Sequence, residues 1–195
     1  FSSEVPSILS LFTDKVKLNA ASVLNYLLRS SYDVAHFTQT EEVKALAPGS
    51  ILTVNIKEKL SFSLKRWWEP SIAEDKTISF EAATRKLKEL FLKSVRLHMR
   101  SDVPIGAALS GGIDSSAIVC AMRYLEPEMP IHTFSYIAKG TSLNEENWVD
   151  LINDYVKAIP HKIELDYKDL YRDLDDVILF QGEPFGSTSI YAQYC

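Results

Sequence analysis

The sequence predicts an α/β fold built on a parallel sheet, with a small α+β piece before it. Strand-like and helix-like segments alternate in the second half of the chain, with strands expected at residues 103–109, 131–137 and 161–165 and helices at 115–125 and 144–158. Alternation of this kind gives parallel strands joined by right-handed crossovers. The first strand is apolar on both faces, as a strand inside such a sheet should be.

The first half of the chain has a different pattern. Residues 19–30 carry apolar side chains at helical spacing, and residues 51–56 and 61–67 alternate in character around a charged turn, which indicates a β-hairpin. Residues 69–76 combine a proline with mixed charge and are the expected linker. Ser79 is placed to cap a long helix that ends near Arg100.

A loop of small residues, Ser110–Ser116, lies between the first strand and its helix and has the features of a phosphate-binding loop. Gly111 and Gly112 let the backbone approach an anion closely and take up positive φ where it is needed. The free amides at the start of the helix add partial positive charge. A ligand-free turn between strand and helix is the alternative interpretation.

The polar side chains of this loop extend the prediction. Ser110, Ser115 and Ser116 carry hydroxyls that can donate to phosphate oxygens. Asp114 repels a phosphate unless a cation lies between them, so the loop implies Mg²⁺.

Two other nucleotide motifs are excluded by residue type. Gly106 and Gly111 have the spacing of a P-loop, but Gly112 and Ile113 stand where that motif needs Lys and Ser or Thr. A Gly-x-Gly-x-x-Gly dinucleotide fingerprint is also absent from this loop.

The sequence resembles the synthetase domain of glutamine-hydrolysing asparagine synthetases, members of the ATP pyrophosphatase superfamily. The resemblance rests on residues 101–106 leading into 109–116, on Thr133–Tyr136 as a second strand, and on Glu183–Phe185 as an acidic segment before a proline. It implies a truncated sheet of the ATP pyrophosphatase, or adenine nucleotide alpha hydrolase-like, type.

Upstream, residues 37–52 and the pair Trp67 and Trp68 resemble the end of the family's glutaminase domain and the hairpin that follows it. The resemblance therefore divides the chain into residues 1–70, a C-terminal remnant of the glutaminase domain with the joining hairpin, and residues 71–195, the N-terminal part of the ATP-dependent synthetase domain.

What the resemblance implies is ATP-dependent asparagine synthesis. The β-carboxylate of aspartate attacks the α-phosphorus of ATP, pyrophosphate leaves, and ammonia derived from glutamine displaces AMP from the acyl-adenylate. Asp114 is the expected catalytic and metal-binding residue. The expected ATP-binding residues are Leu109, Ser110, Gly111, Gly112, Ile113, Asp114, Ser115, Ser116 and Tyr136.

Departures from the family pattern limit this expectation. The chain begins with Phe1 where the glutaminase needs an N-terminal Cys, and it stops before the family's acidic Gly-rich segment. We therefore expect an ATP site without full turnover, on a sheet whose missing strands leave an unpaired edge. A related amide-forming cyclase, of the β-lactam synthetase or lasso-peptide cyclase type, and a non-catalytic ATP-binding module are the alternatives.

Two glutamates outside the loop are further candidates. Glu145 opens the helix at 144–158, where it either approaches the metal or simply favours the helix dipole. Glu183 precedes Pro184 in a loop and is a candidate for substrate contact. The four histidines, His36, His98, His132 and His161, show no metal-ligand spacing.

Composition excludes several classes of protein. The chain has 195 residues, a formal charge of −5 and two cysteines. It lacks a run of roughly 18 apolar residues for a membrane span, a basic excess for nucleic acid and a disulfide framework. We expect a cytoplasmic enzyme fragment, cut at both ends, with small-molecule substrates and no membrane or nucleic-acid partner; the intact enzyme is a candidate homodimer.

Overall fold

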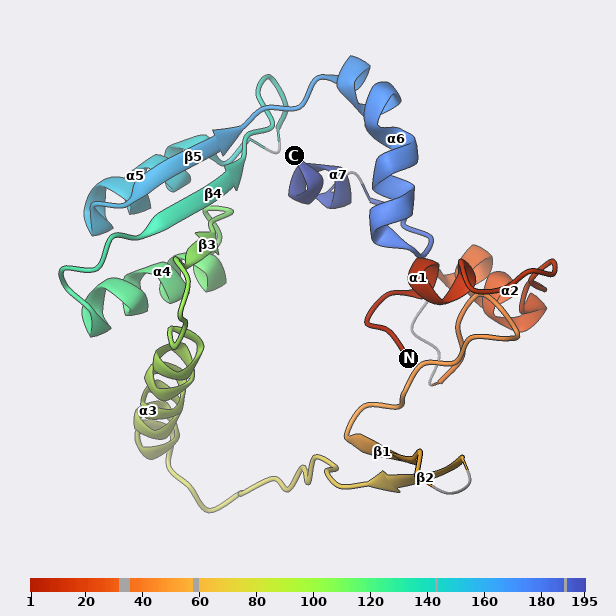
Figure 1. The fold of residues 1–195 in the computed structure, drawn as a ribbon. Helices are drawn as coiled ribbons and strands as arrows, with labels where there is room; N and C mark the ends of the chain where they lie inside the picture. Colours follow the sequence, from red (N-terminus) through yellow and green to blue (C-terminus); the bar gives the residue numbers. More distant parts are fainter. Residues whose placement is uncertain (32–35, 58–59, 143, 188) are drawn as a thin grey trace. The chain divides into compact units, whose positions relative to one another are not determined.

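The computed structural model describes residues 1–31, 36–57, 60–142, 144–187 and 189–195. The chain forms two compact units, one of residues 1–74 with 172–194 and the other of residues 75–171 with Cys195 (Figure 1). Each unit is described by itself below.

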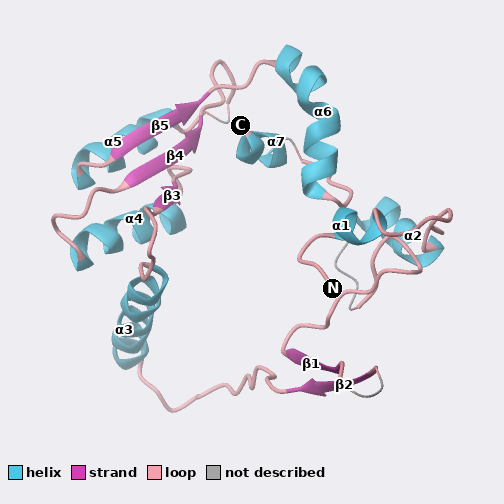
Figure 2. Ribbon diagram, in the orientation of Figure 1, coloured by secondary structure: helices cyan, strands magenta, loops and turns pink. Residues whose placement is uncertain are grey.

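The second unit contains a parallel sheet of strands β3 (Gly106–Ala108), β4 (His132–Tyr136) and β5 (Ile159–Ile163), in the order β3-β4-β5 (Figure 2). Helix α4 (Ile113–Leu125) connects β3 to β4, and α5 (Glu146–Val156) connects β4 to β5. The predicted α/β fold with a parallel sheet is therefore confirmed.

The core of this unit lies between the sheet and its helices. Alternate β4 residues face the helices, because Thr133 and Ser135 are buried whereas Phe134 and Tyr136 are exposed. The buried apolar cluster consists of Val95, Leu109, Val119, Ala121, Met122, Ile131, Val149 and Val156.

Strand boundaries differ from the prediction at two prolines. β3 begins at Gly106 rather than at residue 103, since Pro104 has no N–H to offer a ladder. β5 begins at Ile159, before the predicted start, and includes Pro160. An edge strand tolerates a proline, and β5 has a neighbour on one side within the described sheet.

Helix α3 (Phe80–His98) confirms the predicted long helix. The Ser79 side chain accepts a hydrogen bond from the Ala82 amide at 3.2 Å, as the cap prediction requires. Val95 of this helix is buried in the core, whereas Phe80 in its first turn is 82% exposed.

The first unit consists of short elements: α1 (Val5–Leu9), α2 (Ala20–Arg29), the antiparallel hairpin β1 (Ser50–Asn55) and β2 (Ser61–Arg66), and α7 (Ser189–Tyr194). The boundary between the two units falls within helix α6 (Tyr167–Gln181): residues 167–171 belong to the second unit and residues 172–181 to the first. The hairpin and α2 match the prediction, whereas α1 and α7 were not predicted. No helix in the described part of the chain is long and apolar enough to cross a membrane.

Candidate functional site

The candidate site begins where β3 ends. Leu109 is buried, its amide donates to the Phe134 carbonyl at 2.9 Å, and its own carbonyl accepts a hydrogen bond from Ser135 Oγ at 2.6 Å. Both hydrogen bonds anchor the start of the loop to β4, so the residues that follow leave the sheet in a fixed direction.

The two glycines of the loop have different conformations. Gly111 has φ +82°, which a residue with a Cβ rarely adopts. Gly112 has φ −72° and ψ 163°, and it caps α4. The amides of Ile113, Asp114 and Ser115 begin the helix, so they have no acceptor within it. Several donors are thus available at the end of α4 that carries positive partial charge.

Two serine hydroxyls hold the loop together. Ser115 Oγ lies 3.0 Å from Ser110 Oγ, accepts a hydrogen bond from the Ser110 amide at 3.2 Å and donates to the Gly112 carbonyl at 3.2 Å. Ser116 Oγ is buried and has no hydrogen-bond partner among the described residues. The loop is therefore braced by its own side chains before any ligand is present.

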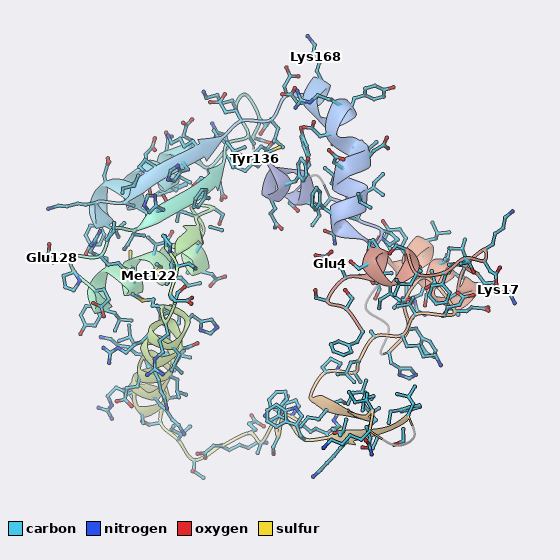
Figure 3. All side chains as sticks on the ribbon, in the orientation of Figure 1. Glu4, Lys17, Met122, Glu128, Tyr136 and Lys168 are labelled. Atoms are coloured by element: carbon cyan, nitrogen blue, oxygen red, sulfur yellow. The ribbon has the colours of Figure 1, made fainter. Side chains whose placement is uncertain are left out.

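Exposed side chains lie in the first turn of α4 and at the end of β4. Ile113 and Asp114 are exposed in the first turn of α4. Tyr136, which is labelled in Figure 3, ends β4. Its side chain is 48% exposed. The register pairs Ala108 with Phe134, so the chain after Leu109 leaves the sheet beside Tyr136. Parallel sheets bind ligands beyond these carboxyl ends.

The structure also brings Glu145 and Trp148 to the loop. A Cβ on Gly111 would lie 3.2 Å from the Glu145 carbonyl oxygen and 3.0 Å from Trp148 Cβ. The sequence placed Glu145 at the start of α5 but did not predict contact with Gly111. The β-α-β topology could have indicated this contact, because helices that follow parallel strands all begin at the same edge of the sheet.

An ion-pair cluster offsets the negative charge at the start of α5. Lys162 Nζ lies 2.8 Å from Glu146 Oε1 and 2.7 Å from Asp150 Oδ1. The hydrogen bonds that the Lys162 ammonium donates to Asp150 and then Glu146 raise the pKa of Lys162 above its ordinary value. A stably protonated lysine here reduces the repulsion that two carboxylates would exert on an anion near the loop.

In the described part of the chain, the predicted substrate contact and the predicted metal site are not part of a larger cluster at the loop. Glu183 belongs to the first unit, whereas the glycine loop belongs to the second. No group of three or more His, Cys, Asp or Glu side chains suited to a metal occurs among the residues that the structure describes. A cation at Asp114 would therefore need ligands from the bound molecule or from water.

A comparison with protein families shows to which family the chain belongs. The family model for asparagine synthase matches residues 86–195, which is more than half of the chain and includes the whole glycine loop. The chain belongs to the asparagine synthase family. The resemblance found in the sequence is thereby confirmed, together with the parallel sheet that it implied.

Individual members of the asparagine synthase family show the extent of the match. A putative glutamine-hydrolysing asparagine synthetase 2 of Methanocaldococcus jannaschii is 36% identical over 107 residues, which are 55% of this chain and 21% of the relative. Asparagine synthetase 3 of Bacillus subtilis is 29% identical over 155 residues, 73% of this chain and 25% of the relative. Asparagine synthetase 1 of Bacillus subtilis is 33% identical over 108 residues, 54% of this chain and 16% of the relative. The chain thus spans a quarter or less of the length of these relatives.

Proposed function

We propose that this chain contributes the ATP-binding part of an asparagine synthetase, with residues 71–195 belonging to its synthetase domain and residues 1–70 to the end of its glutaminase domain. The observation that carries the proposal is Gly111 at φ +82°, in a loop that leads into the free amides of α4. That geometry suits a phosphate group at the carboxyl edge of a parallel sheet.

The loop fits a triphosphate by the chemistry of its donors. Main-chain amides at the start of α4 are free to donate to a phosphate, and Gly112 at the cap adds no side chain in front of them. Asp114 presents an exposed carboxylate in the same turn. Mg²⁺ prefers oxygen ligands and is commonly held by one or two carboxylates plus substrate phosphates, so Asp114 suffices as the protein's ligand.

In the proposed reaction, bound ATP supplies a phosphoanhydride whose cleavage activates the side-chain carboxylate of aspartate for amidation by ammonia. The amides at Gly111–Ser115 stabilise negative charge on the departing phosphates without a covalent nucleophile from the protein. Asp114 would hold the cation, which would supply positive charge to the phosphates; this is the catalytic role proposed for Asp114. The main chain at Leu109 and Tyr136 flanks the adenosine.

We expect nucleotide binding rather than turnover from this chain, because it spans at most 25% of the relatives compared above. For the intact enzyme, we propose small-molecule substrates, ammonia supplied from glutamine, a homodimer and a cytoplasmic location.

Calorimetry with Mg·ATP tests the proposal. We expect saturable binding that needs both Mg²⁺ and the triphosphate, with AMP binding more weakly. Asp114→Asn removes the charge that holds the cation and should lower affinity about tenfold or more, because a hydrogen bond or contact to a charged group contributes roughly 1.5–3 kcal/mol. Asp154 is an exposed acidic residue of α5, so Asp154→Asn is the matched control and should leave the affinity for Mg·ATP unchanged.

The outcome that contradicts the proposal is equally definite. A folded chain that takes up no Mg·ATP, or an Asp114→Asn variant that binds it as tightly as the parent, excludes the site at this loop. A Gly112→Val variant provides an independent check: its Cβ would meet Ser110 Oγ at 3.4 Å, an ordinary contact, while its two methyl groups would stand at the loop and should lower the affinity for Mg·ATP.

A further inference from the structure

Two histidines separated by 29 positions in the sequence meet on the sheet of the second unit. His132 begins β4 and His161 lies in β5, where it pairs in register with Phe134. Thr133 and Ser135 of β4 face the helices, so His132 and Phe134 point to the opposite face. His161 shares that face, because its ring contacts both His132 and Phe134.

The two imidazole rings meet edge to edge through nitrogen atoms. His132 Nδ1 lies 2.9 Å from His161 Nε2, the ring centroids are 5.2 Å apart and the ring planes are inclined by 20°. The His161 ring also stacks on Phe134 at a centroid distance of 4.7 Å and an angle of 12°. Stacking on Phe134 restricts the plane of the His161 ring.

Two imidazole nitrogens this close can both bind one transition-metal ion once the hydrogen bond between them opens and the rings turn toward the ion. Neutral imidazole is the commonest protein ligand for such ions. Metal–nitrogen bonds of about 2.0–2.1 Å place two neighbouring ligand atoms roughly 3 Å apart, close to the observed separation of the histidine nitrogens. His161 is exposed and His132 is half-buried, so an ion from solvent can reach both.

We propose that His132 Nδ1 and His161 Nε2 form a two-histidine site for a divalent first-row transition ion such as Ni²⁺ or Zn²⁺. The ion replaces the proton shared by the two rings, and that proton moves through solvent to the far nitrogen of the ring that donated it. Water fills the other coordination positions, because no cluster of three metal-ligating side chains occurs among the described residues.

This site is independent of the proposed ATP site. Mg²⁺ is a hard cation that prefers oxygen ligands, so it does not compete for two imidazole nitrogens. Failure of the histidine site would leave the assignment of the glycine loop unchanged, and the reverse also holds.

Calorimetric titration with NiCl₂ in a non-coordinating buffer at pH 7.5 tests the proposal. The parent for the series carries Cys195→Ser, because the exposed Cys195 thiol would itself bind the ion. We expect one Ni²⁺ per chain. His132→Gln or His161→Gln should weaken binding roughly a hundredfold, since the second ligand of a chelating pair acts at high effective concentration. His98→Gln, an exposed histidine of the same unit, is the control and should change nothing.

A second measurement needs only the parent protein. We expect Zn²⁺ to shift the ring NMR signals of His132 and His161 together, and those of His98 not at all. Unshifted ring signals, equal Ni²⁺ affinity in the His161→Gln variant, or an equal loss in His98→Gln would each overturn the proposal.

Discussion

At the level of single residues, the conformation of Gly111 determines the shape of the candidate site. Its φ of +82° turns the chain from β3 into α4, and its missing side chain leaves room for Glu145 and Trp148 of the neighbouring helix start. A residue other than glycine at position 111 would therefore be strained in its backbone, and its Cβ would also crowd Glu145 and Trp148.

Gly111→Ala should destabilise the protein by more than Gly140→Ala. Gly140 also has positive φ, +75°, but nothing lies within 4 Å of the Cβ position there. We expect about 1–2 kcal/mol for the left-handed conformation at either site, and roughly 1 kcal/mol or more in addition at Gly111 from overpacking against α5. Denaturant unfolding of the two variants measures the difference, and equal losses would show that the contact with Trp148 carries no cost.

The sequence predicted the residues of the loop but not all of their partners. Ser110–Ser116 could be located because glycine, serine and aspartate have distinct chemical uses between a strand and a helix. The meeting of His132 with His161 depends on the register of β4 against β5, which a single sequence does not specify. Periodicity identifies a strand far better than it identifies the neighbour opposite each residue.

At the level of elements, a long helix with a cap was predictable and the two shortest helices were not. Helix α3 has a capping serine and five turns of helical pattern, so Ser79 marked its start correctly. Helices α1 and α7 contain five and six residues. Helices of that length have little intrinsic stability and form through contacts that a sequence pattern does not contain.

Helix α7 has such a contact with α6. The buried Tyr191 donates its hydroxyl to Asp173 Oδ2 at 2.9 Å. Arg172 and then Tyr191 hold the pKa of Asp173 below its ordinary value of 3.8. A lowered carboxyl pKa stabilises the folded state above the unfolded-state value, and this contribution is lost as the pH falls through the folded-state value.

We therefore expect acid to loosen α7. Amide NMR shifts of residues 189–194 should move toward unfolded values as the pH is lowered below 3.8, the ordinary pKa of the Asp173 carboxyl. Tyr191→Phe should loosen α7 already at neutral pH and reduce the dependence on pH. Asp175→Asn, an exposed neighbour, should leave the titration unchanged; an unaltered titration in Tyr191→Phe would show that Asp173 does not hold this helix.

At the level of the whole molecule, stability is distributed unevenly between the units. The second unit has a continuous buried cluster around β4, whereas every residue of the strands β1 and β2 except Ser50 is exposed. The outer face of the sheet also leaves Phe134 and Tyr136 nearly half exposed. The division of the chain into a remnant of one domain and part of another remains a prediction from the resemblance.

Hydrogen exchange on the full chain tests how the two units are coupled. We expect amides of β4 to open with a free energy near the global value, about 5 kcal/mol or more, and those of the hairpin with about 0–2 kcal/mol. Val149→Ala removes two methyl groups from the buried cluster and should cost about 2 kcal/mol. Exchange should then accelerate in α4, β4 and α5 while α2 stays unchanged, because α2 belongs to the other unit and has no part in that cluster. Equal acceleration in α2 would mean that the two units unfold as one cooperative body.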